Sequence, residues 1–142
     1  MRVMVIIKTT PQIEKDNPLP DPKLMEEMGK YNEELIKAGV VLAMDGLHPS
    51  SKGARVKFSG KSRTVVDGPF TEAKELIAGF WIWQVKSLEE AIEWAKRIPA
   101  DNTEIEVREI GEMEDFESIL SEEEIEHKKA KRAELPNQTF NQ

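Results

Sequence analysis

Two carboxylates flank a rigid turn near the middle of the chain, and they are the residues best suited to chemistry. Asp67 begins the turn Asp67-Gly68-Pro69-Phe70, and Glu75 follows five residues after Phe70. A proline fixes its own backbone and favours extended backbone in the residue before it, so we expect the turn to hold Asp67 at the end of a strand. If Asp67 and Glu75 converge in a partly buried cleft, charge repulsion and desolvation would raise the pKa of one carboxylate. That carboxylate could then act as a general acid or base near neutral pH.

Each carboxylate also has a purely structural interpretation. Asp67 could accept backbone N–H groups in an Asx-type turn. Glu75 could lie at a strand edge in solvent, paired with Lys74 or Arg63. The sequence leaves both interpretations open.

Other polar residues are candidates for the same pocket. His48 lies in a loop after a strand, where it could serve as an acid–base partner; an exposed loop histidine is the alternative. Tyr31 and Asn32, on the first long helix, could line a pocket between helix and sheet, with Tyr31 donating a hydrogen bond. The alternative places Tyr31 in the core. The remaining expected pocket-lining residues come from the turn and the aromatic strand: Gly68, Pro69, Phe70 and Trp83.

Several kinds of site are missing from the sequence. It contains no Cys, which excludes disulfides, thiolate nucleophiles and Cys-ligated zinc and is compatible with a reducing cytoplasm. It has no Gly-rich phosphate loop, no His-Glu-x-x-His helix, no Gly-x-Ser-x-Gly elbow and no carboxylates at metal-ligand spacing, so we expect no cofactor and no metal. The apolar start, residues 1–8, is too short for a signal peptide, and no later run reaches membrane-spanning length. We therefore expect a cytoplasmic protein with no membrane contact.

Charge is distributed unevenly along the chain. The formal net charge is -7, of which residues 1–110 contribute -2 and residues 111–142 contribute -5. The body of the chain has no basic stripe that would neutralise phosphates, so we expect no nucleic-acid binding. The acidity belongs mainly to the C-terminal segment.

The spacing of apolar residues predicts a single α+β domain. Short apolar runs or period-two alternation predict strands at residues 2–8, 40–44, 54–58, 63–66, 76–85 and 103–110. Asp21 as N-cap, with Pro22 first, starts a helix that Gly39 ends, and a Ser87–Glu90 capping box starts another that Pro99 ends. The proline-rich stretch 9–20 is expected to be a loop. This order matches a ferredoxin-like βαββαβ sheet with an inserted β-hairpin and both helices on one face.

The strand at residues 76–85 is apolar on both faces. Simple alternation places Ile77, Trp81, Trp83 and Val85 on one face and Leu76, Ala78, Phe80 and Ile82 on the other. Two helices can cover only one of these faces. A second copy of the sheet is the simplest cover for the other, so we predict a homodimer through sheet-to-sheet packing, with Trp81, Trp83 or Phe80 near the interface.

Three segments of the chain resemble the DGPF branch of the YCII-related family. They are residues 67–81, beginning Asp67-Gly68-Pro69-Phe70, with Gly46-Leu47-His48-Pro49-Ser50-Ser51 before them and Ser87-Leu88-Glu89-Glu90-Ala91 after them. The resemblance covers residues 1–116 and implies a dimeric α/β-barrel of ferredoxin-like protomers. It implies little about chemistry, because most members have no established activity.

Founding members of the broader family are proposed to use a His on the first helix and an Asp just before the Pro that ends the second. Here the first helix, residues 21–38, contains no His, and Ile98 precedes Pro99. The proposed dyad is absent, so its chemistry does not transfer to this chain. Branch members are often encoded beside alternative sigma factors, which supports a regulatory role by analogy only.

Residues 117–142 are expected to form an acidic helical tail after the domain at residues 1–116. The helix is predicted over 118–133, it is weakly amphipathic, and it could pack across a dimer partner; residues 136–142 are expected to be frayed. Two classes of function remain open. One is a cofactor-independent enzyme that uses Asp67, Glu75 and His48 on a small organic molecule, and the other is a non-catalytic dimeric module that binds a small molecule or regulates.

Overall fold

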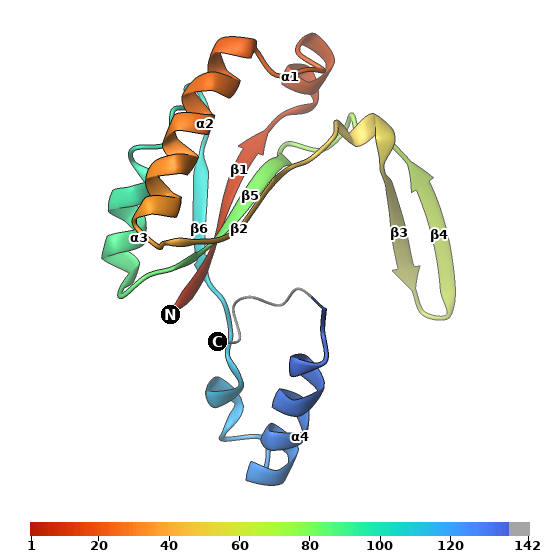
Figure 1. Ribbon diagram of the computed structural model, residues 1–142. Coiled ribbons are helices and arrows are strands. Elements are labelled where there is room, and N and C mark those ends of the chain that lie inside the picture. The colour runs from red at the N-terminus through yellow and green to blue at the C-terminus, as the bar shows by residue number, and fades with distance from the viewer. Residues whose placement is uncertain (137–142) are drawn as a thin grey trace.

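Four antiparallel strands from distant parts of the sequence form the main sheet, in the order β2-β5-β1-β6. The strands are β1 (Arg2–Thr9), β2 (Val41–Gly46), β5 (Leu76–Gln84) and β6 (Ile105–Glu109). Helices α2 (Pro22–Lys37) and α3 (Leu88–Ala95) both cover one face of it (Figure 1). This computed structural model, which describes residues 1–136, confirms the expected ferredoxin-like α+β fold.

Local capping chemistry sets where the two covering helices begin. The Asp21 side chain accepts a hydrogen bond from the backbone N of Lys23, and Pro22 occupies the first turn of α2, as predicted. The Ser87 side chain accepts from the backbone N of Glu90, and the Glu90 side chain accepts from Lys86 N rather than from Ser87 itself. The α2 helix is followed by Gly39, whose φ of 71° suits glycine.

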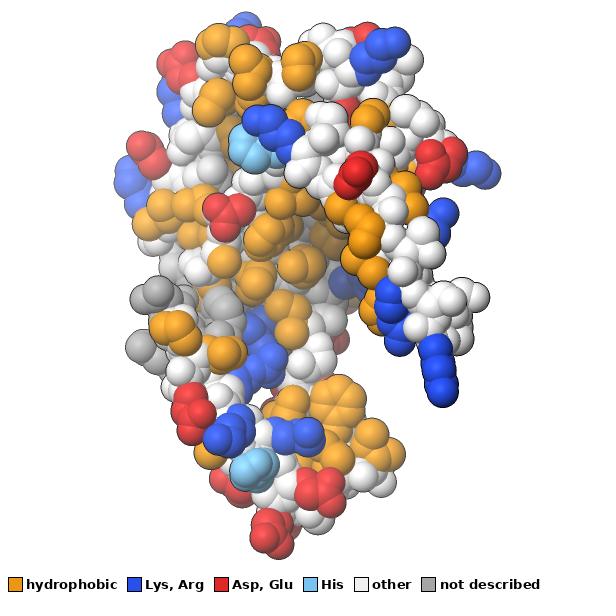
Figure 2. All heavy atoms as spheres, turned by 90° about the vertical axis from the view of Figure 1, so that its right-hand side faces the viewer, with side chains coloured by type: hydrophobic (Ala, Val, Ile, Leu, Met, Phe, Trp, Pro, Cys, Tyr) orange, Lys and Arg blue, Asp and Glu red, His pale blue; other side chains and the backbone are white. Residues whose placement is uncertain are grey.

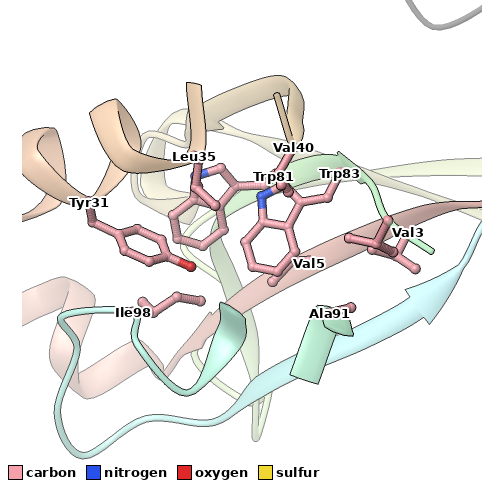
Figure 3. Packing of buried hydrophobic residues seen from close by; sticks show 10 residues of the cluster. Val3, Val5, Tyr31, Leu35, Val40, Trp81, Trp83, Ala91 and Ile98 are labelled. Atoms are coloured by element: carbon pink, nitrogen blue, oxygen red, sulfur yellow. The ribbon is translucent and has the colours of Figure 1, made fainter. Parts of the chain in front are cut away.

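The core lies between this helical layer and the sheet. Trp83, Leu35, Val3 and Val5 are its largest fully buried side chains. Trp81 packs beside Trp83, with ring centroids 5.9 Å apart, and the two indoles lie beneath α2 (Figure 3). Burial of such side chains is the main favourable term for folding.

A β-bulge in β5 changes which side chains face the helices. The register between β1 and β5 shifts at Ile7 and Lys8, so Lys8 pairs with Ile77 and Ala78 has no opposite residue. Paired residues share a face, and one extra residue reverses the alternation beyond it. Leu76 is therefore buried and Ile77 is 49% exposed, which is the reverse of their predicted faces.

The bulge does not affect the C-terminal half of β5. Trp81, Trp83 and Val85 are buried together, as alternation predicts, while Phe80 and Ile82 take the opposite face. Because both indoles lie in the core under the helices, the expectation that Trp81 or Trp83 lies near a sheet-to-sheet interface is corrected. Of the three aromatic residues expected near the interface, Phe80 lies on the uncovered face of the sheet.

The proline-rich stretch predicted as a loop contains a short helix, α1 (Pro11–Asp16). Thr10 caps it by accepting a hydrogen bond from Ile13 N, and Pro11 occupies the first helical position. Proline is tolerated there because the first N–H groups of a helix have no internal partner. The expectation of a loop is wrong at residues 11–16, because proline breaks a helix only beyond its first turn.

The inserted hairpin forms a sheet of its own. Its strands are β3 (Ala54–Ser59) and β4 (Ser62–Asp67), which pair with each other and with no strand of the main sheet. The 3-10 turn η1 (Ser50–Lys52) leads into it. The hairpin projects away from the main sheet on the side opposite the helices (Figure 1).

The C-terminal segment forms a small lobe of the 3-10 turn η2 (Met113–Phe116) and helix α4 (Glu122–Ala133). Arg2 ties this lobe to the sheet, since Nε and Nη2 of Arg2 lie 2.7 and 3.0 Å from the two carboxylate oxygens of Glu112. The α4 helix begins later than predicted because Ser121, not Ser118, is its N-cap. Of the end predicted to be frayed, all but Pro136 lies outside the described residues.

Candidate functional site

A cavity of about 460 Å³ opens between α2 and one end of the main sheet. Apolar side chains dominate it, and methionine is prominent among them. Its lining residues are Ile7, Pro20, Leu24, Met25, Met28, Asn32, Met44, Asp45, Gly46, Ala78, Gly79, Phe80, Trp81 and Ala100. A largely apolar cavity of this size with few polar groups is typical of a small-molecule site.

Asn32 brings a hydrogen-bonding group to this apolar cavity. Its Oδ1 accepts a hydrogen bond from Nε1 of Trp81 at 2.9 Å. An indole nitrogen can only donate, so the amide oxygen of Asn32 must face Trp81. The amide nitrogen carries two N–H donors and has no hydrogen-bond partner among residues 1–136.

Tyr31 supports this arrangement from the core rather than from the cavity. Its ring meets Trp81 edge-on, with centroids 6.0 Å apart and planes at 80°, and its hydroxyl donates to the backbone O of Trp94 at 2.7 Å. Burial raises the pKa of Tyr31, so the phenol stays neutral and remains a donor. The structure thus places Tyr31 in the core and Asn32 among the residues that line the cavity between α2 and the sheet.

The predicted acid–base residues lie elsewhere among the described residues. Asp67 is exposed at the end of β4, paired with Ala54, and His48 is exposed in the loop before η1. Neither they nor Glu75 belong to the lining of the cavity beside Asn32. The expected constellation of Asp67, Glu75 and His48 is thus not assembled around that cavity.

Glu75 belongs instead to a cluster around Lys8. Nζ of Lys8 lies 3.1 Å from Glu75, 3.0 Å from Glu104 and 3.1 Å from Glu106. Hydrogen bonds to Glu104, Glu106 and Glu75 raise the pKa of Lys8 and keep it charged. Glu104 and Glu106 flank the start of β6, which places three carboxylates from two distant segments on one cation.

The Asp67 to Phe70 turn is held by close backbone packing. A Cβ at Gly68 would lie 1.7 Å from the backbone O of Ser50, so only glycine fits without a shift of the chain. Gly68 N also donates to the backbone O of Gly53 at 2.9 Å. Phe70 is buried, and the guanidinium of Arg55 lies 4.0 Å from its ring centroid.

Ser50 and Glu14 connect this turn to α1. Oγ of Ser50 donates to Oε2 of Glu14 at 2.7 Å and accepts from Phe70 N at 3.2 Å. Ser50 N donates to Oε1 of Glu14 at 3.0 Å. The turn is therefore a structural junction between α1, η1, the hairpin and β5.

The other expected pocket residues are divided between junction and core. Pro69 lines a separate cavity of about 360 Å³ beside α1, shared with Glu14, Pro49 and Thr71. Gly68 and Phe70 belong to the lining of neither cavity. Trp83 is fully buried, and its Nε1 has no hydrogen-bond partner among the described residues, so the expectation that it lines a pocket is corrected.

Sequence reasoning missed several residues that line the larger cavity. Met25 and Met28 lie on the predicted first helix, and Met44 and Asp45 lie at the end of the predicted strand 40–44, but none of them is among the expected pocket residues. Two features of the sequence pointed weakly to this region. Methionines are frequent in adaptable binding surfaces, and an acidic residue, Asp45, directly follows the apolar strand 40–44.

Comparison with known proteins shows the family of this chain. The sequence model of the YCII-related domain matches residues 1–114, and the chain belongs to that family. An uncharacterized protein of Rhizobium meliloti (strain 1021) is 29% identical over 82 residues. That match covers 58% of this chain and 66% of the relative, which is just under two thirds of its length.

The described part of the chain contains neither a membrane-spanning helix nor a metal-binding cluster. Within residues 1–136, no helix has both the length and the apolar character needed to cross a membrane. The same residues contain no group of three or more His, Asp or Glu side chains placed to hold a metal ion.

Proposed function

We propose that this protein is a homodimeric module that binds a small, mainly apolar molecule carrying a hydrogen-bond acceptor. The observation that carries the proposal is the amide nitrogen of Asn32, which has no hydrogen-bond partner among the described residues and belongs to a residue that lines a largely apolar cavity. Methionine side chains adapt their shape easily, which suits a range of flat or branched ligands. We also assign the chain to the DGPF branch of the family, for which residues 67–70 are the main evidence. We further propose that the protein is cytoplasmic.

The ligand would place its acceptor, such as a carbonyl or carboxylate oxygen, against Asn32. The rest of the molecule would contact Met25, Met28 and Met44. Transfer of an apolar ligand from water into such a cavity is favourable, and the single polar contact fixes its orientation. This division of roles explains why the cavity needs so few polar groups.

Asn32→Asp gives the sharpest test. The aspartate can still accept from Trp81 Nε1, so the core contact survives, but it offers an acceptor where the ligand needs a donor. We expect compounds from a metabolite library that raise the melting temperature of the wild type to lose that effect in Asn32→Asp. Glu33→Gln, on the exposed neighbouring position, is the control and should retain it. Equal shifts in wild type and Asn32→Asp would refute the role of the amide.

Acid–base catalysis is the second candidate function. It rests on Asp45, the one carboxylate among the lining residues, which pairs with Phe80 and so shares the face of the sheet away from α2. Such a carboxylate could exchange a proton only with a ligand that reaches past the edge of the cavity. Asp45→Asn should then keep ligand binding but abolish turnover of a bound compound, measured by product formation; turnover equal to that of the wild type would rule out Asp45 as the base.

The homodimer is supported by the face of the sheet that the helices leave uncovered. Register places Met4 opposite Ile82 and Ile6 opposite Phe80, on the face away from Val3 and Val5. These four side chains are only partly buried within the chain. Figure 2 shows hydrophobic side chains gathered in a hollow on this side of the molecule. A second copy, packed sheet against sheet, would remove them from water.

A further inference from the structure

The β3–β4 hairpin carries an apolar strip that this chain leaves in water. Val56 pairs with Val65 and Phe58 with Arg63, so all four share one face of the hairpin. Val56, Val65 and Phe58 are 54%, 64% and 72% exposed. A two-stranded ribbon is at best marginally stable by itself in water, and three exposed apolar side chains add to that cost.

The position of the hairpin limits what can cover this strip. The hairpin stands off from the main sheet on the uncovered side (Figure 1), and the hollow with its apolar floor lies beside it (Figure 2). The α4 lobe projects at the lower end of the same hollow (Figure 2). A partner protein that enters the hollow would therefore contact both the uncovered face of the sheet and the hairpin.

The charge of the hairpin identifies a partner that suits it. Residues 54–67 contain four basic side chains and one acidic side chain, in a chain of net charge -7. The rest of the chain is therefore strongly acidic, with residues 111–142 alone contributing -5. A second copy of this chain offers both an apolar sheet face and an acidic surface, and opposite potentials favour their association.

We propose that the hairpin is an arm that each copy of this chain extends onto the other. Val56, Phe58 and Val65 of one copy pack against the second copy, and Arg63, which shares their face and stacks on the Phe58 ring, meets its acidic surface. Twofold symmetry makes the exchange reciprocal, so each copy gives one arm and receives one. The inference rests on the homodimer proposed above and adds a second contact outside the sheet-to-sheet interface.

Two substitutions on opposite faces of the hairpin test the arm. Phe58→Asp places a charge in the apolar strip, whereas Thr64→Asp places the same charge on the other face, opposite Lys57. Sedimentation should show the dimer dissociation constant raised at least about tenfold by Phe58→Asp and within about twofold of wild type for Thr64→Asp, since tenfold corresponds to loss of one good apolar contact. An unchanged constant for Phe58→Asp would refute the arm while the dimer stands.

Cross-linking supplies a second readout that does not depend on the folding of Phe58→Asp. Because the chain contains no Cys, Val65→Cys labelled with a photoreactive benzophenone carries a single probe on the strip. Illumination should yield a covalent product of twice the chain mass, and the same label at Thr64→Cys should yield little. Products of single mass only, from a sample that sediments as a dimer, would overturn the arm. A wild type that sediments as a monomer at tens of micromolar would overturn the dimer itself.

Discussion

Nε1 of Trp81 donates to Oδ1 of Asn32 across 2.9 Å, whereas the indole of Trp83, two residues further along β5, has no such partner among the described residues. Both indoles are almost fully buried in one cluster. The difference matters because a satisfied buried donor stabilises a fold, and an unsatisfied one costs free energy. The pair separates the tryptophan that positions the cavity from the one that only fills the core.

The same comparison predicts unequal effects of two conservative substitutions. Trp81→Phe removes a hydrogen bond and leaves Oδ1 of Asn32 without its donor, while Trp83→Phe removes a donor that had no partner. The lost volume is similar in both. We expect Trp81→Phe to lower the free energy of unfolding by about 1 kcal/mol more than Trp83→Phe, measured by urea denaturation. Equal losses would mean that the Asn32 contact contributes nothing to stability.

Gly68 is required by the close approach of Ser50. Because a Cβ at Gly68 would lie 1.7 Å from a backbone oxygen, Gly68→Ala forces the turn and the neighbouring η1 segment apart. We expect a loss of about 1–3 kcal/mol in the free energy of unfolding, the usual range for overpacking. Gly29→Ala is the control, since no atom lies within 4 Å of its Cβ position inside α2, and it should gain about 0.5–1 kcal/mol. Two substitutions of one chemistry should thus differ in sign.

The Ser50 hydroxyl, held by Glu14, should protect the backbone amide of Phe70 from hydrogen exchange. Ser50→Ala removes the hydroxyl that accepts from Phe70 N and donates to Glu14. We expect a loss of about 1–2 kcal/mol and faster hydrogen exchange at the Phe70 amide, since each hydrogen bond contributes about 1 kcal/mol. Ser51→Ala, at the exposed neighbouring position, should leave that amide unchanged. Protection of Phe70 that survives Ser50→Ala would show that the backbone alone holds the turn.

Lys8 should stabilise the folded protein, because it neutralises the repulsion between three neighbouring carboxylates at the main sheet. Lys8→Met leaves Glu75, Glu104 and Glu106 without their shared cation, so we expect a lower melting temperature than for the control Lys74→Met. The loss should shrink in high salt, which screens the remaining repulsion. A melting temperature equal to that of Lys74→Met would show that the cluster is energetically neutral.

The dependence of this effect on pH has a definite sign. The pKa of Lys8 is raised in the folded protein, so the folded state binds its proton more tightly than the unfolded chain does. The contribution of Lys8 is therefore fully present below the unfolded lysine pKa of about 10.4 and is lost as the pH rises through the higher folded value. The difference in melting temperature between wild type and Lys8→Met should stay constant from pH 7 to 9 and decline only in strong alkali.

The sequence by itself determined the six strands and the two long helices of the domain and their order, though not the short helix α1. Asp21, Pro22 and Gly39 define one helix, and Ser87 with Glu90 starts another, because caps act over three or four residues. The same local logic located six strands, two of which form the hairpin, and six strands with two helices in this order leave few topologies. The place of Asn32 on a helix that must pack on a sheet made it a candidate cavity residue.

Only the tertiary structure decided which side chains meet. One bulge at Ala78 exchanged the faces of Leu76 and Ile77, and no local pattern reports an unopposed residue. Glu75 turned to Lys8, because β1 and β6 bring Lys8 and two further carboxylates beside it. Local turn chemistry fixes the backbone at Asp67. The partner of a charged side chain is set instead by which strands pair, and Lys8 and Glu104 meet although they lie about 100 residues apart in the sequence. The spacing of residues along the chain does not contain this long-range constraint.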